Sequence, residues 1–367
     1  MPSPGATRVA TALSLGRVLT LRLSAADRAL LDAQFPAGIL LRVPRAQRHP
    51  HTDATGEVVV VMGMPGAGKS TAAQEYVARG FRRLNRDEAG GRLSALVRDL
   101  DAGLVAGQRH WVLDNTYAAR AARNEVIECA WTYGLPVRCV FLDTTLADAQ
   151  INAVTRLLEA HGRLPSPDEL RAQGKTDHRY FGPDAQFRYE RTFEPPVMDE
   201  GFSHIEQRAF VRRVQPEFTR KALMLEYDDV LCTSAGGAPA VRDVDDVRLS
   251  TERRAVLAHY AAQGWVLCAL AWRPDADPLQ LHSMFEKTRE LLGLEIDIAY
   301  CPHPAGPPVC WCRKPLPGLV LEFAQTHRLA LGQSIMVGRA PADRTLAQRL
   351  RMTYHDAPEF FGKSTRP

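Results

Sequence analysis

The sequence predicts an α/β protein made of two consecutive domains, each built on a mostly parallel sheet. Short apolar runs alternate with amphipathic stretches from residue 57 onward, the pattern that parallel sheets and their crossover helices produce. A basic, proline-containing break at Arg212–Arg220 interrupts this alternation, and 367 residues exceed the length of one typical compact core. We therefore expect an extension over residues 1–55, a first domain over residues 56–215 and a second over residues 216–367.

The first domain begins with a buried strand, a glycine-rich turn and a helix. Glu57–Met62 is a short, β-branched apolar run, as in strands that are covered on both faces. The following helix should stop at Gly80, because glycine tolerates the left-handed conformation that ends many helices. Further strands are expected at Phe81–Leu84, Trp111–Asp114 and Val137–Asp143, and helices at Ser70–Arg79, Arg120–Tyr133 and Ala147–Leu158.

The second domain repeats this alternation, and residues 1–55 carry only weak signals. In that extension Arg17–Leu23 has the pattern of a short strand, and Ser24 that of a cap for a helix over Ala25–Gln34. We find no residues there that indicate chemistry. In the second domain the expected strands are Ala222–Tyr227, Val266–Ala271 and Ser334–Val337, and the expected helices are Ser250–Gln263, Asp277–Leu291 and Gly318–Thr326.

Composition limits the class of protein. The formal net charge of +4 is too small to indicate a polyanionic partner by itself, and it does not oppose one. No apolar run is long enough to span a bilayer, and Met1–Leu15 lacks the basic head and apolar core of a secretory signal. We therefore expect a cytoplasmic protein without a membrane partner.

A phosphate-binding loop lies between the first strand and the first helix. Residues 63–70 read G-M-P-G-A-G-K-S and fit G-x-x-x-x-G-K-[ST], in which glycines let successive backbone N–H groups face one anion. Lys69 can reach the β- and γ-phosphates, and the Ser70 hydroxyl can bind Mg²⁺. The sequence therefore predicts a site for ATP or GTP with Mg²⁺. The residues expected to bind the nucleotide are Gly63, Pro65, Gly66, Ala67, Gly68, Lys69, Ser70 and Thr71.

Polar residues follow two further strands of the predicted sheet. Arg86 and Asp87 come directly after Phe81–Leu84, and Asp114 closes the next strand. Ligands of parallel sheets bind at the carboxyl ends of the strands, so Asp87 could take a proton from an attacking hydroxyl there. Considered alone, the first pair also fits a solvated turn and Asp114 a helix cap. These alternatives stay open at this level.

Arginines on the predicted helices are candidates for phosphate contacts. Arg120 and Arg123 follow Asp114 on one helix, and Arg156 lies on the amphipathic helix over residues 147–158. A lid arginine would neutralise charge that develops on a transferring phosphate. In isolation, each of these residues is more typical of a solvated helix face.

In series, these blocks resemble the kinase domain of polynucleotide 5′-kinase/3′-phosphatases. The resemblance spans residues 57–205 and keeps the order of the family's motifs. The blocks are G-M-P-G-A-G-K-S-T, L-N-R-D-E-A-G-G, L-D-N-T-Y-A-A-R-A-A-R, a helix with Asn152 and Arg156, and F-E-P-P followed by E-G-F. The second, third and last blocks are more specific than the phosphate-binding loop.

This resemblance implies a kinase that uses ATP with Mg²⁺ and accepts single-stranded 5′-hydroxyl ends of RNA or DNA. It implies that Asp87 is the general base, that Asp114 is the family's strand-end aspartate and that Arg156 is the lid arginine. Together with Lys69, these residues form the expected catalytic set. One departure is that Arg156 is the only basic residue in the stretch 151–156. The residues expected at the acceptor are Arg86, Arg123, Asn115 and Thr116.

The first strand expected in the second domain leads into Glu226-Tyr227-Asp228. This segment resembles the first motif of haloacid-dehalogenase-type (HAD-type) phosphatases, which have D-x-D at this place and use its first aspartate to attack phosphorus. Glutamate is one methylene longer than that aspartate. A misplacement of about 1 Å can lower a rate on the order of 100-fold. Lys314 and Asp343 match family positions, so the expected degenerate site comprises Glu226, Asp228, Lys314 and Asp343.

Two more motif positions of this domain have changed. Ala271 replaces the serine or threonine that holds the phosphate, and Arg339 replaces an aspartate that binds Mg²⁺ in the family. We therefore expect an inactive phosphatase domain, the alternative being an enzyme with a glutamate nucleophile. A retained but inactive domain is expected to act as a scaffold, either for a homo-oligomer or for the nucleic-acid strand.

Three cysteines and one histidine form a metal-binding pattern. Cys301, His303, Cys310 and Cys312 read C-x-H…C-x-C, and three thiolates with one imidazole suit tetrahedral Zn²⁺ that has no open position. The site is therefore expected to be structural, the alternative being free thiols in a loop. The loop also resembles the zinc loop of bacterial histidinol-phosphate and heptose-bisphosphate phosphatases.

Two other functions remain compatible with the sequence. A kinase of the same fold could act on a small-molecule or nucleoside hydroxyl, and a nucleotide-gated nucleic-acid-binding module would need no turnover. Lys69, Ser70, Asp87 and Arg156 are all present, which disfavours the binding module. Competition by oligonucleotides for the acceptor site would separate a polynucleotide kinase from a small-molecule kinase.

Overall fold

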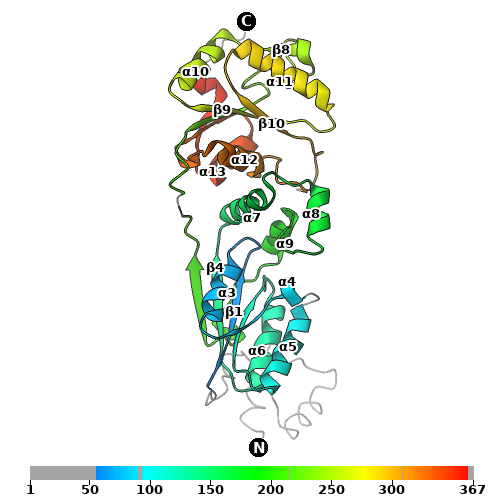
Figure 1. Ribbon diagram of the computed structural model, residues 1–367, viewed down its shortest axis with the longest axis vertical. Helices are drawn as coiled ribbons and strands as arrows, with labels where there is room; N and C mark the ends of the chain where they lie inside the picture. Colours follow the sequence, from blue (N-terminus) through cyan, green and yellow to red (C-terminus); the bar gives the residue numbers. More distant parts are fainter. Residues whose placement is uncertain (1–54, 90–92, 214, 308, 363–367) are drawn as a thin grey trace, which may run out of the picture. The chain divides into compact units, whose positions relative to one another are not determined.

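Figure 1 shows the chain as a computed structural model. The structure describes residues 55–89, 93–213, 215–307 and 309–362, so the strand, cap and helix expected within residues 17–34 lie outside the described part. The described residues form two compact units. The first contains residues 55–63, Gly68–Asp143 and Thr192–Ala209, and the second contains Met64–Ala67, Thr144–Arg191 and residues 210–362.

The division into units differs from the boundaries expected from the sequence. Thr144–Arg191, expected in the first domain, groups with the C-terminal residues. The reason is that helix α7 (Leu146–His161) shares a hydrophobic core with helix α12 (Gly318–His327). The domain boundaries near residues 55 and 215 stay a prediction.

The first unit contains a five-stranded parallel sheet in the order β2-β3-β1-β4-β5. Apolar side chains fill β1, which is buried along almost its whole length, as expected for a strand covered on both faces. In the pairing register Val61 lies opposite Asp114 and Val140, so the carboxyl ends of β1, β3 and β4 meet at one edge. The strands are β1 (Glu57–Gly63), β2 (Arg82–Leu84), β3 (His110–Asp114), β4 (Val137–Asp143) and β5 (His204–Ala209).

Helices cover both faces of this sheet (Figure 1). Helix α3 (Lys69–Val77) packs on β1 and β3, while α5 (Leu93–Val105) and α6 (Arg120–Thr132) share the hydrophobic core on the other face with alternate residues of β1. Helix α5 passes close to Trp111. A Cβ at Gly103 would lie 2.1 Å from that indole, so glycine is required there.

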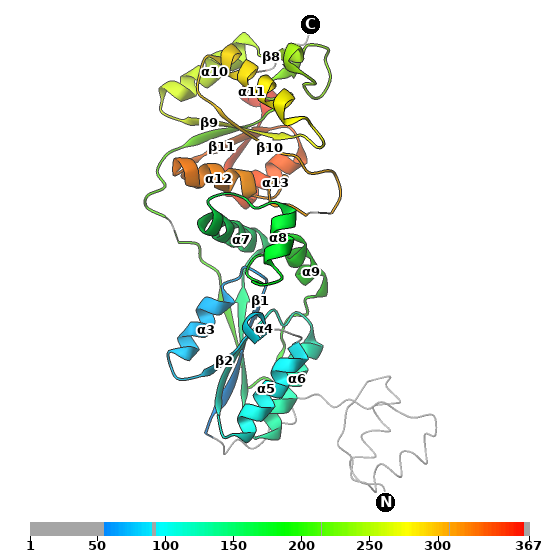
Figure 2. The ribbon, with the colours of Figure 1, turned by 45° about the vertical axis from the view of Figure 1, so that its right-hand side comes forward.

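The second unit contains another five-stranded parallel sheet, in the order β10-β9-β6-β11-β12. Helices α10 and α11 cover one face and α12 and α13 the other (Figure 2). Helix α14 shares the core of α10 and α11. The strands are β6 (Ala222–Glu226), β9 (Val266–Trp272), β10 (Asp297–Cys301), β11 (Ile335–Gly338) and β12 (Thr353–Asp356). The helices are α10 (Thr251–Ala262), α11 (Pro278–Leu292), α13 (Pro341–Arg349) and α14 (Ala357–Phe360), and a short antiparallel pair, β7 (Thr233–Ser234) and β8 (Val247–Arg248), follows β6.

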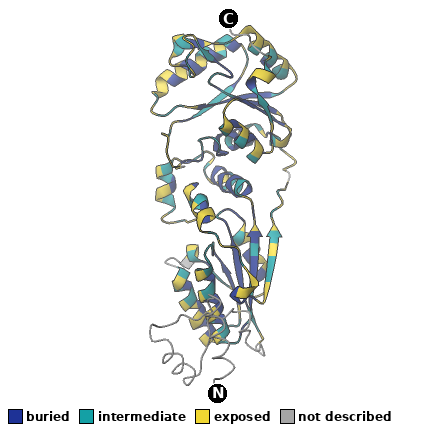
Figure 3. Cartoon of the chain, turned by 180° about the vertical axis from the view of Figure 1, so that it is seen from behind, coloured by how far each residue is buried: buried dark blue, intermediate teal, exposed yellow. Residues whose placement is uncertain are grey.

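The predicted α/β class with two parallel sheets is confirmed, and the expected strands and helices lie within a few residues of the observed ones. No expectation from the sequence covered β5, β7, β8, β10, β12, α5, α13, α14 or the short helices α4 (Arg86–Ala89), α8 (Pro167–Gln173) and α9 (Asp184–Thr192). Strand β5 reads H-I-E-Q-R-A and lies at a sheet edge with no buried residue, so no apolar run marks it (Figure 3). Within the described ranges, no helix combines the length and apolar character needed to cross a membrane.

Candidate active site and metal centre

The phosphate-binding loop joins the end of β1 to the start of α3. Gly68 is the N-cap of α3 with φ of 91°, and a Cβ there would meet nothing within 4 Å. Glycine is therefore required by backbone conformation rather than by space. The ammonium group of Lys69 donates to the Gly63 carbonyl at 3.0 Å, and Ser70 and Thr71 are exposed on the first turn of α3. The loop thus presents its helix N-terminus and two hydroxyls at the carboxyl end of β1.

The middle of the same loop is held by side chains of α7 and α9. Asn152 Nδ2 donates to the Gly66 carbonyl at 2.9 Å, and Gln186 Nε2 donates to the Pro65 carbonyl at 2.8 Å. Gly66 also approaches α7 closely, since a Cβ there would lie 2.5 Å from the Ala149 carbonyl oxygen. No local sequence pattern marks Asn152 or Gln186 as a partner of the loop, so Asn152 was expected only as part of a motif and Gln186 was not expected at all.

Two strand-end loops of the first unit are joined through asparagine side chains. Asn85 Nδ2 donates to the Asp114 carbonyl at 2.7 Å, and the Arg86 N–H donates to Asn115 Oδ1 at 3.0 Å. The Asp87 N–H donates to Asn85 Oδ1 at 2.7 Å, so the side chain of Asp87 stands at the start of α4. The structure thus brings the predicted Asp87 and Asp114 loops together, and the Asp87 side chain is 39% exposed.

Asp114 has a cationic partner that the sequence analysis missed. The guanidinium of Arg83 donates to both of its carboxylate oxygens, from Nε at 2.8 Å and from Nη2 at 2.7 Å. The bond to Asp114 raises the pKa of Arg83. Arg83 also contacts Glu88. Thr116, two residues after Asp114, is half-buried. Asp114 is therefore a buried carboxylate at the end of β3, with both of its oxygens bonded to Arg83.

Arg123 was expected at the acceptor, and the structure buries it instead. It is completely buried on α6. Its Nε and Nη2 donate to the Glu200 carboxylate at 2.8 and 2.7 Å, and Nη1 donates to the carbonyls of Tyr117 and Ala118. A substrate phosphate has no access to a guanidinium in this position. We therefore withdraw the acceptor contact and assign Arg123 to fixing the loop after β3.

The E-G-F block has a packing role in the first unit. Glu200 is the buried partner of Arg123, and Phe202 is fully buried in the core formed with α5 and α6. A Cβ at Gly201, which has φ of 108°, would lie 2.3 Å from the Trp131 ring. These residues thus close the core beside α6.

Arg156 lies on α7 in the second unit. Its Nη1 donates to the Arg179 carbonyl at 3.2 Å, and its side chain is half-buried. Burial, and next the nearby Arg179 charge, lower the pKa of Arg156. Arg156 is four residues from Asn152, so both side chains lie on one face of α7. The structure therefore places the predicted lid arginine one turn from a residue that holds the phosphate loop.

The second sheet carries an ion-paired cluster at the carboxyl end of β6. The Lys314 ammonium contacts the Glu226 carboxylate and lies 2.6 Å from Asp343 Oδ1. Asp343 is fully buried, and its Oδ2 accepts the backbone N–H groups of Arg339 and Ala340 at 3.1 and 3.0 Å. Burial lowers the pKa of Lys314, while Asp343 opposes this shift.

The neighbouring carboxylates are also paired with arginines. Asp228 Oδ1 accepts Arg273 Nη2 at 2.5 Å and the Val241 N–H at 3.0 Å, and Arg339 pairs with Asp229. Burial raises the pKa of Asp228, and Arg273 opposes this shift. Arg273 was not predicted from the sequence, although it lies only two residues after the altered position Ala271. Each carboxylate of the cluster is thus paired with a lysine or an arginine of the same cluster.

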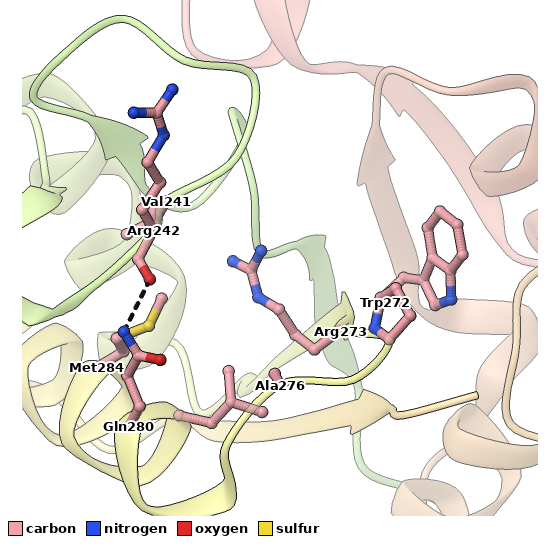
Figure 4. A pocket seen from close by; sticks show the side chains of 9 residues that line it. Val241, Arg242, Trp272, Arg273, Ala276, Gln280 and Met284 are labelled. Atoms are coloured by element: carbon pink, nitrogen blue, oxygen red, sulfur yellow. Dashed lines mark hydrogen bonds between the residues drawn. The ribbon is translucent and has the colours of Figure 1, made fainter. Parts of the chain in front are cut away.

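A pocket of about 220 Å³ opens beside this cluster. Figure 4 shows Arg242 and Arg273 among its lining residues, with Gln280 donating to the Arg242 carbonyl at 3.2 Å. The remaining lining includes Trp272 and Met284. The pocket is therefore a mixed surface with cationic and apolar parts.

The four predicted metal ligands come together. The sulfur and nitrogen atoms of Cys301, His303, Cys310 and Cys312 all lie within 4.8 Å of one another. The Cys301–Cys310 sulfur distance is 3.8 Å, comparable to the edge of a tetrahedron of zinc–thiolate bonds, about 3.8 Å. The donor set and its spacing therefore fit Zn²⁺. The His303 carbonyl also accepts Trp272 Nε1 at 2.8 Å, which ties the loop to the end of β9.

We predict that the purified chain contains about one zinc ion per molecule. Substitution Cys310→Ser should remove most of it and increase hydrogen exchange in residues 301–313, because the metal would then have lost one of four ligands. Elemental analysis and exchange mass spectrometry measure both effects. Cys129→Ser is the matched control, since Cys129 is a free thiol outside the cluster. A zinc-free wild-type chain would contradict the assignment.

Comparisons with known proteins give matches to parts of this chain. Residues 58–161 match the family model described as AAA domain. The chain is 26% identical over 155 residues to the bifunctional polynucleotide phosphatase/kinase of Schizosaccharomyces pombe, a match that covers 42% of this chain and 34% of that protein. It is 29% identical over 136 residues to the D-glycero-beta-D-manno-heptose-1,7-bisphosphate 7-phosphatase of Helicobacter pylori, covering 34% of this chain and 76% of that protein.

Solved structures overlap with this chain only at low TM-scores and low sequence identity. The D,D-heptose 1,7-bisphosphate phosphatase from B. bronchiseptica is 21% identical with a TM-score of 0.34, covering 40% of this chain and 88% of that chain. A chain of the Pnkp1/Rnl/Hen1 RNA repair complex is 14% identical with a TM-score of 0.29, covering 83% of this chain and 97% of that chain.

The two parallel five-stranded sheets confirm the expected fold class, and the AAA-domain match over residues 58–161 covers the half that carries the phosphate-binding loop. Within this class, it is similar in sequence to a bifunctional polynucleotide phosphatase/kinase, which confirms the resemblance of the motif series. The matched segment spans only about a third of the length of that yeast relative, 34%.

Proposed function

We propose that the protein is an ATP-dependent kinase of 5′-hydroxyl ends of RNA or DNA. The observation that carries this proposal is the joining of the Asp87 and Asp114 loops by Asn85 and Asn115. It places an exposed carboxylate at the edge of the sheet where β1 runs into the phosphate-binding loop. An ATP site and a proton acceptor at one sheet edge are what phosphoryl transfer to a hydroxyl requires.

The nucleotide would be held mainly by the phosphate-binding loop. Lys69 would contact the β- and γ-phosphates and Ser70 would hold Mg²⁺, whose charge offsets that of the phosphates when it is bound. Backbone N–H groups of the loop would face the same phosphates. The residues assigned to the nucleotide are Gly63, Pro65, Gly66, Ala67, Gly68, Lys69, Ser70 and Thr71.

The acceptor hydroxyl would lose its proton to Asp87. Its oxygen then forms a bond to the γ-phosphorus, the bond from that phosphorus to the bridging oxygen breaks, and ADP leaves. Arg86, whose side chain is 41% exposed beside Asp87, would contact the phosphate of the acceptor nucleotide. Asn115 and Thr116 would complete the acceptor side. Asp114 would act by position, because Arg83 holds both of its oxygens.

Arg156 would be the lid arginine that neutralises charge on the transferring phosphoryl group. Support comes from its place on α7, one turn from the Asn152 that bonds the Gly66 carbonyl. The hydrogen bond from Arg156 to the Arg179 carbonyl would hold the backbone at Arg179 in place. Loss of charge at this position should lower turnover more than ATP affinity.

The HAD-like domain is proposed to be inactive as a phosphatase. Glutamate stands at the nucleophile position, Ala271 provides no hydroxyl, and Arg339 supplies a cation where the family has a metal ligand. Lys314 and Arg273 already pair with the carboxylates that remain, Glu226, Asp228 and Asp343. A substrate phosphate would have to break these pairs before it could bind.

A single experiment tests both halves of the proposal. We expect the protein, with γ-labelled ATP and Mg²⁺, to label the 5′ end of oligonucleotides that carry a 5′-hydroxyl and a 3′-phosphate, and to leave the 3′-phosphate in place. Matched RNA and DNA strands would report the preferred acceptor, and 5′-phosphorylated strands are the control.

The alternative acceptor classes give different results in the same assay. No label on either strand, with ATP binding intact, would indicate a small-molecule or nucleoside acceptor, or a binding module without turnover. Loss of the 3′-phosphate would refute inactivity of the second domain. Labelling that falls with rising salt would support a nucleic-acid acceptor, because phosphate contacts dominate such binding.

A further inference from the structure

The helices that hold the phosphate loop are built into the core of the HAD-like domain. We call residues 146–191, with helices α7, α8 and most of α9, the lid segment. Its apolar side chains share one hydrophobic core with α12 and with the face of the second sheet that α12 and α13 cover. From the lid segment this core contains Ile151, Val154, Leu157, Leu158 and Leu170, and from the HAD-like domain it contains Trp311, Leu319, Val320, Phe323 and Met336.

Polar contacts also connect the lid segment to the HAD-like domain. Trp311 Nε1 donates to the Phe181 carbonyl at 3.1 Å, and the two rings meet edge to face with centroids 6.3 Å apart. The Leu164 N–H donates to Glu322 Oε1 on α12 at 3.2 Å. Both anchors lie in the connections of the lid segment on either side of α8. The segment is therefore attached at its helices and at its loops.

Charged side chains continue this attachment toward the phosphate loop. Asp148, nearly buried on α7, accepts Arg212 at 3.0 Å and lies 3.4 Å from the guanidinium of Arg351, which follows α13. Arg212 Nη2 also donates to Asn152 Oδ1 at 3.0 Å. The Asn152 amide thus has its oxygen fixed by Arg212 and its Nδ2 bonded to the Gly66 carbonyl.

The phosphate loop therefore receives its supports from a segment whose core belongs to the HAD-like domain. Gly66 and Pro65 accept hydrogen bonds from Asn152 and Gln186, and a Cβ at Gly66 would clash with the Ala149 carbonyl of α7. Packed cores transmit small displacements because they have little free volume. A shift of α7 on α12 would move the Asn152 amide relative to the Gly66 carbonyl.

We propose that the HAD-like domain is a platform that holds the lid segment, and through Asn152 and Gln186 the phosphate-binding loop, in the form that binds ATP. The proposal rests on the kinase function proposed above. It assigns the domain a task that needs its core and its Trp311 loop but none of the phosphatase groups. A domain with this task needs its fold but does not need the catalytic side chains of a phosphatase.

The test compares two mild core substitutions in the full-length chain. Phe323→Leu lies in the core shared with α7, and Phe285→Leu lies in the core on the opposite face of the same sheet. Both side chains are almost completely buried, at 8% and 6% exposure, so both variants should destabilise the domain similarly. We expect Phe323→Leu to weaken ATP binding roughly fivefold or more, and Phe285→Leu to leave it unchanged.

Binding is measured by titration with Mg-ATP without an acceptor, and hydrogen exchange is followed at residues 63–70 and 146–161. Faster exchange there in Phe323→Leu alone supports the platform. Equal effects of the two variants, or unchanged ATP affinity in Phe323→Leu, would overturn it. Trp311→Phe, which removes the bond to Phe181 and keeps a ring, gives a second variant should Phe323→Leu not fold.

Failure of the platform and failure of the kinase function are distinguishable. A wild-type chain that binds ATP but labels no oligonucleotide would refute the polynucleotide kinase function, and ATP titration of the variants would still decide the platform. A wild-type chain that labels oligonucleotides, with Phe323→Leu binding ATP normally, would refute the platform alone.

Discussion

Replacing Asp87 with asparagine is expected to lower 5′ labelling of oligonucleotides by about 100- to 10,000-fold while ATP affinity stays within about twofold. The amide keeps the size of the side chain but accepts no proton from the attacking hydroxyl. Asp87 is exposed and its backbone N–H is bonded to Asn85, so the substitution should leave the loop in place. Initial rates at saturating ATP and acceptor measure the change in turnover.

The control for Asp87→Asn is a carboxylate of the same unit away from the sheet edge. Asp99 is exposed on α5, and Asp99→Asn should retain the wild-type rate. A rate for Asp87→Asn within a few-fold of wild type would remove Asp87 from the role of base. A large loss of ATP affinity would indicate instead that the loop between β2 and α4 had moved.

Breaking the ion pair between Arg123 and Glu200 is expected to destabilise the first unit by about 3–5 kcal/mol. Both side chains are completely buried, so Glu200→Gln leaves a buried guanidinium without its counter-charge. The two carbonyls that Arg123 also bonds, at Tyr117 and Ala118, carry only partial charge and compensate little. Denaturant dependence of hydrogen exchange in β1 and α6 reports on this unit separately.

Two comparisons separate a structural from a substrate role for Arg123. The nearby pair Arg120–Asp199 is exposed, so Asp199→Asn should cost only about 0–1 kcal/mol. The double variant Arg123→Met with Glu200→Met should recover much of the lost stability, because an apolar pair leaves no buried charge. If this stable double variant had a strongly raised KM for the oligonucleotide, Arg123 would be a substrate ligand after all.

The sequence was sufficient wherever a local pattern carries the signal. The loop G-M-P-G-A-G-K-S is readable because its glycines adopt backbone angles that other residues avoid, as Gly68 does at φ of 91°. The buried strands β1, β6 and β9 are readable because continuous apolar runs of this length are typical of strands covered on both faces. The Cys301–Cys312 cluster is readable because its ligands lie within twelve residues.

The sequence was insufficient wherever a side chain finds its partner across the fold. Arg83 clamps Asp114, and Arg273 pairs with Asp228, yet neither arginine differs locally from a surface residue. Arg123 is the opposite case. Its motif position suggested a substrate contact, but the structure buries its side chain in an ion pair with Glu200. Side-chain pairing of this kind depends on strand order and helix packing, which composition and spacing do not encode.

The sequence by itself determined the two parallel-sheet domains, the phosphate-binding loop and the set of candidate metal ligands, because each depends on neighbouring residues and backbone conformation. Only the tertiary structure decided that α7 shares its core with α12 and that Asn152 and Gln186 bond the phosphate loop. The physical reason is that an amphipathic helix specifies an apolar face but not its partner. That partner is chosen by the shape of the surfaces the rest of the chain makes available.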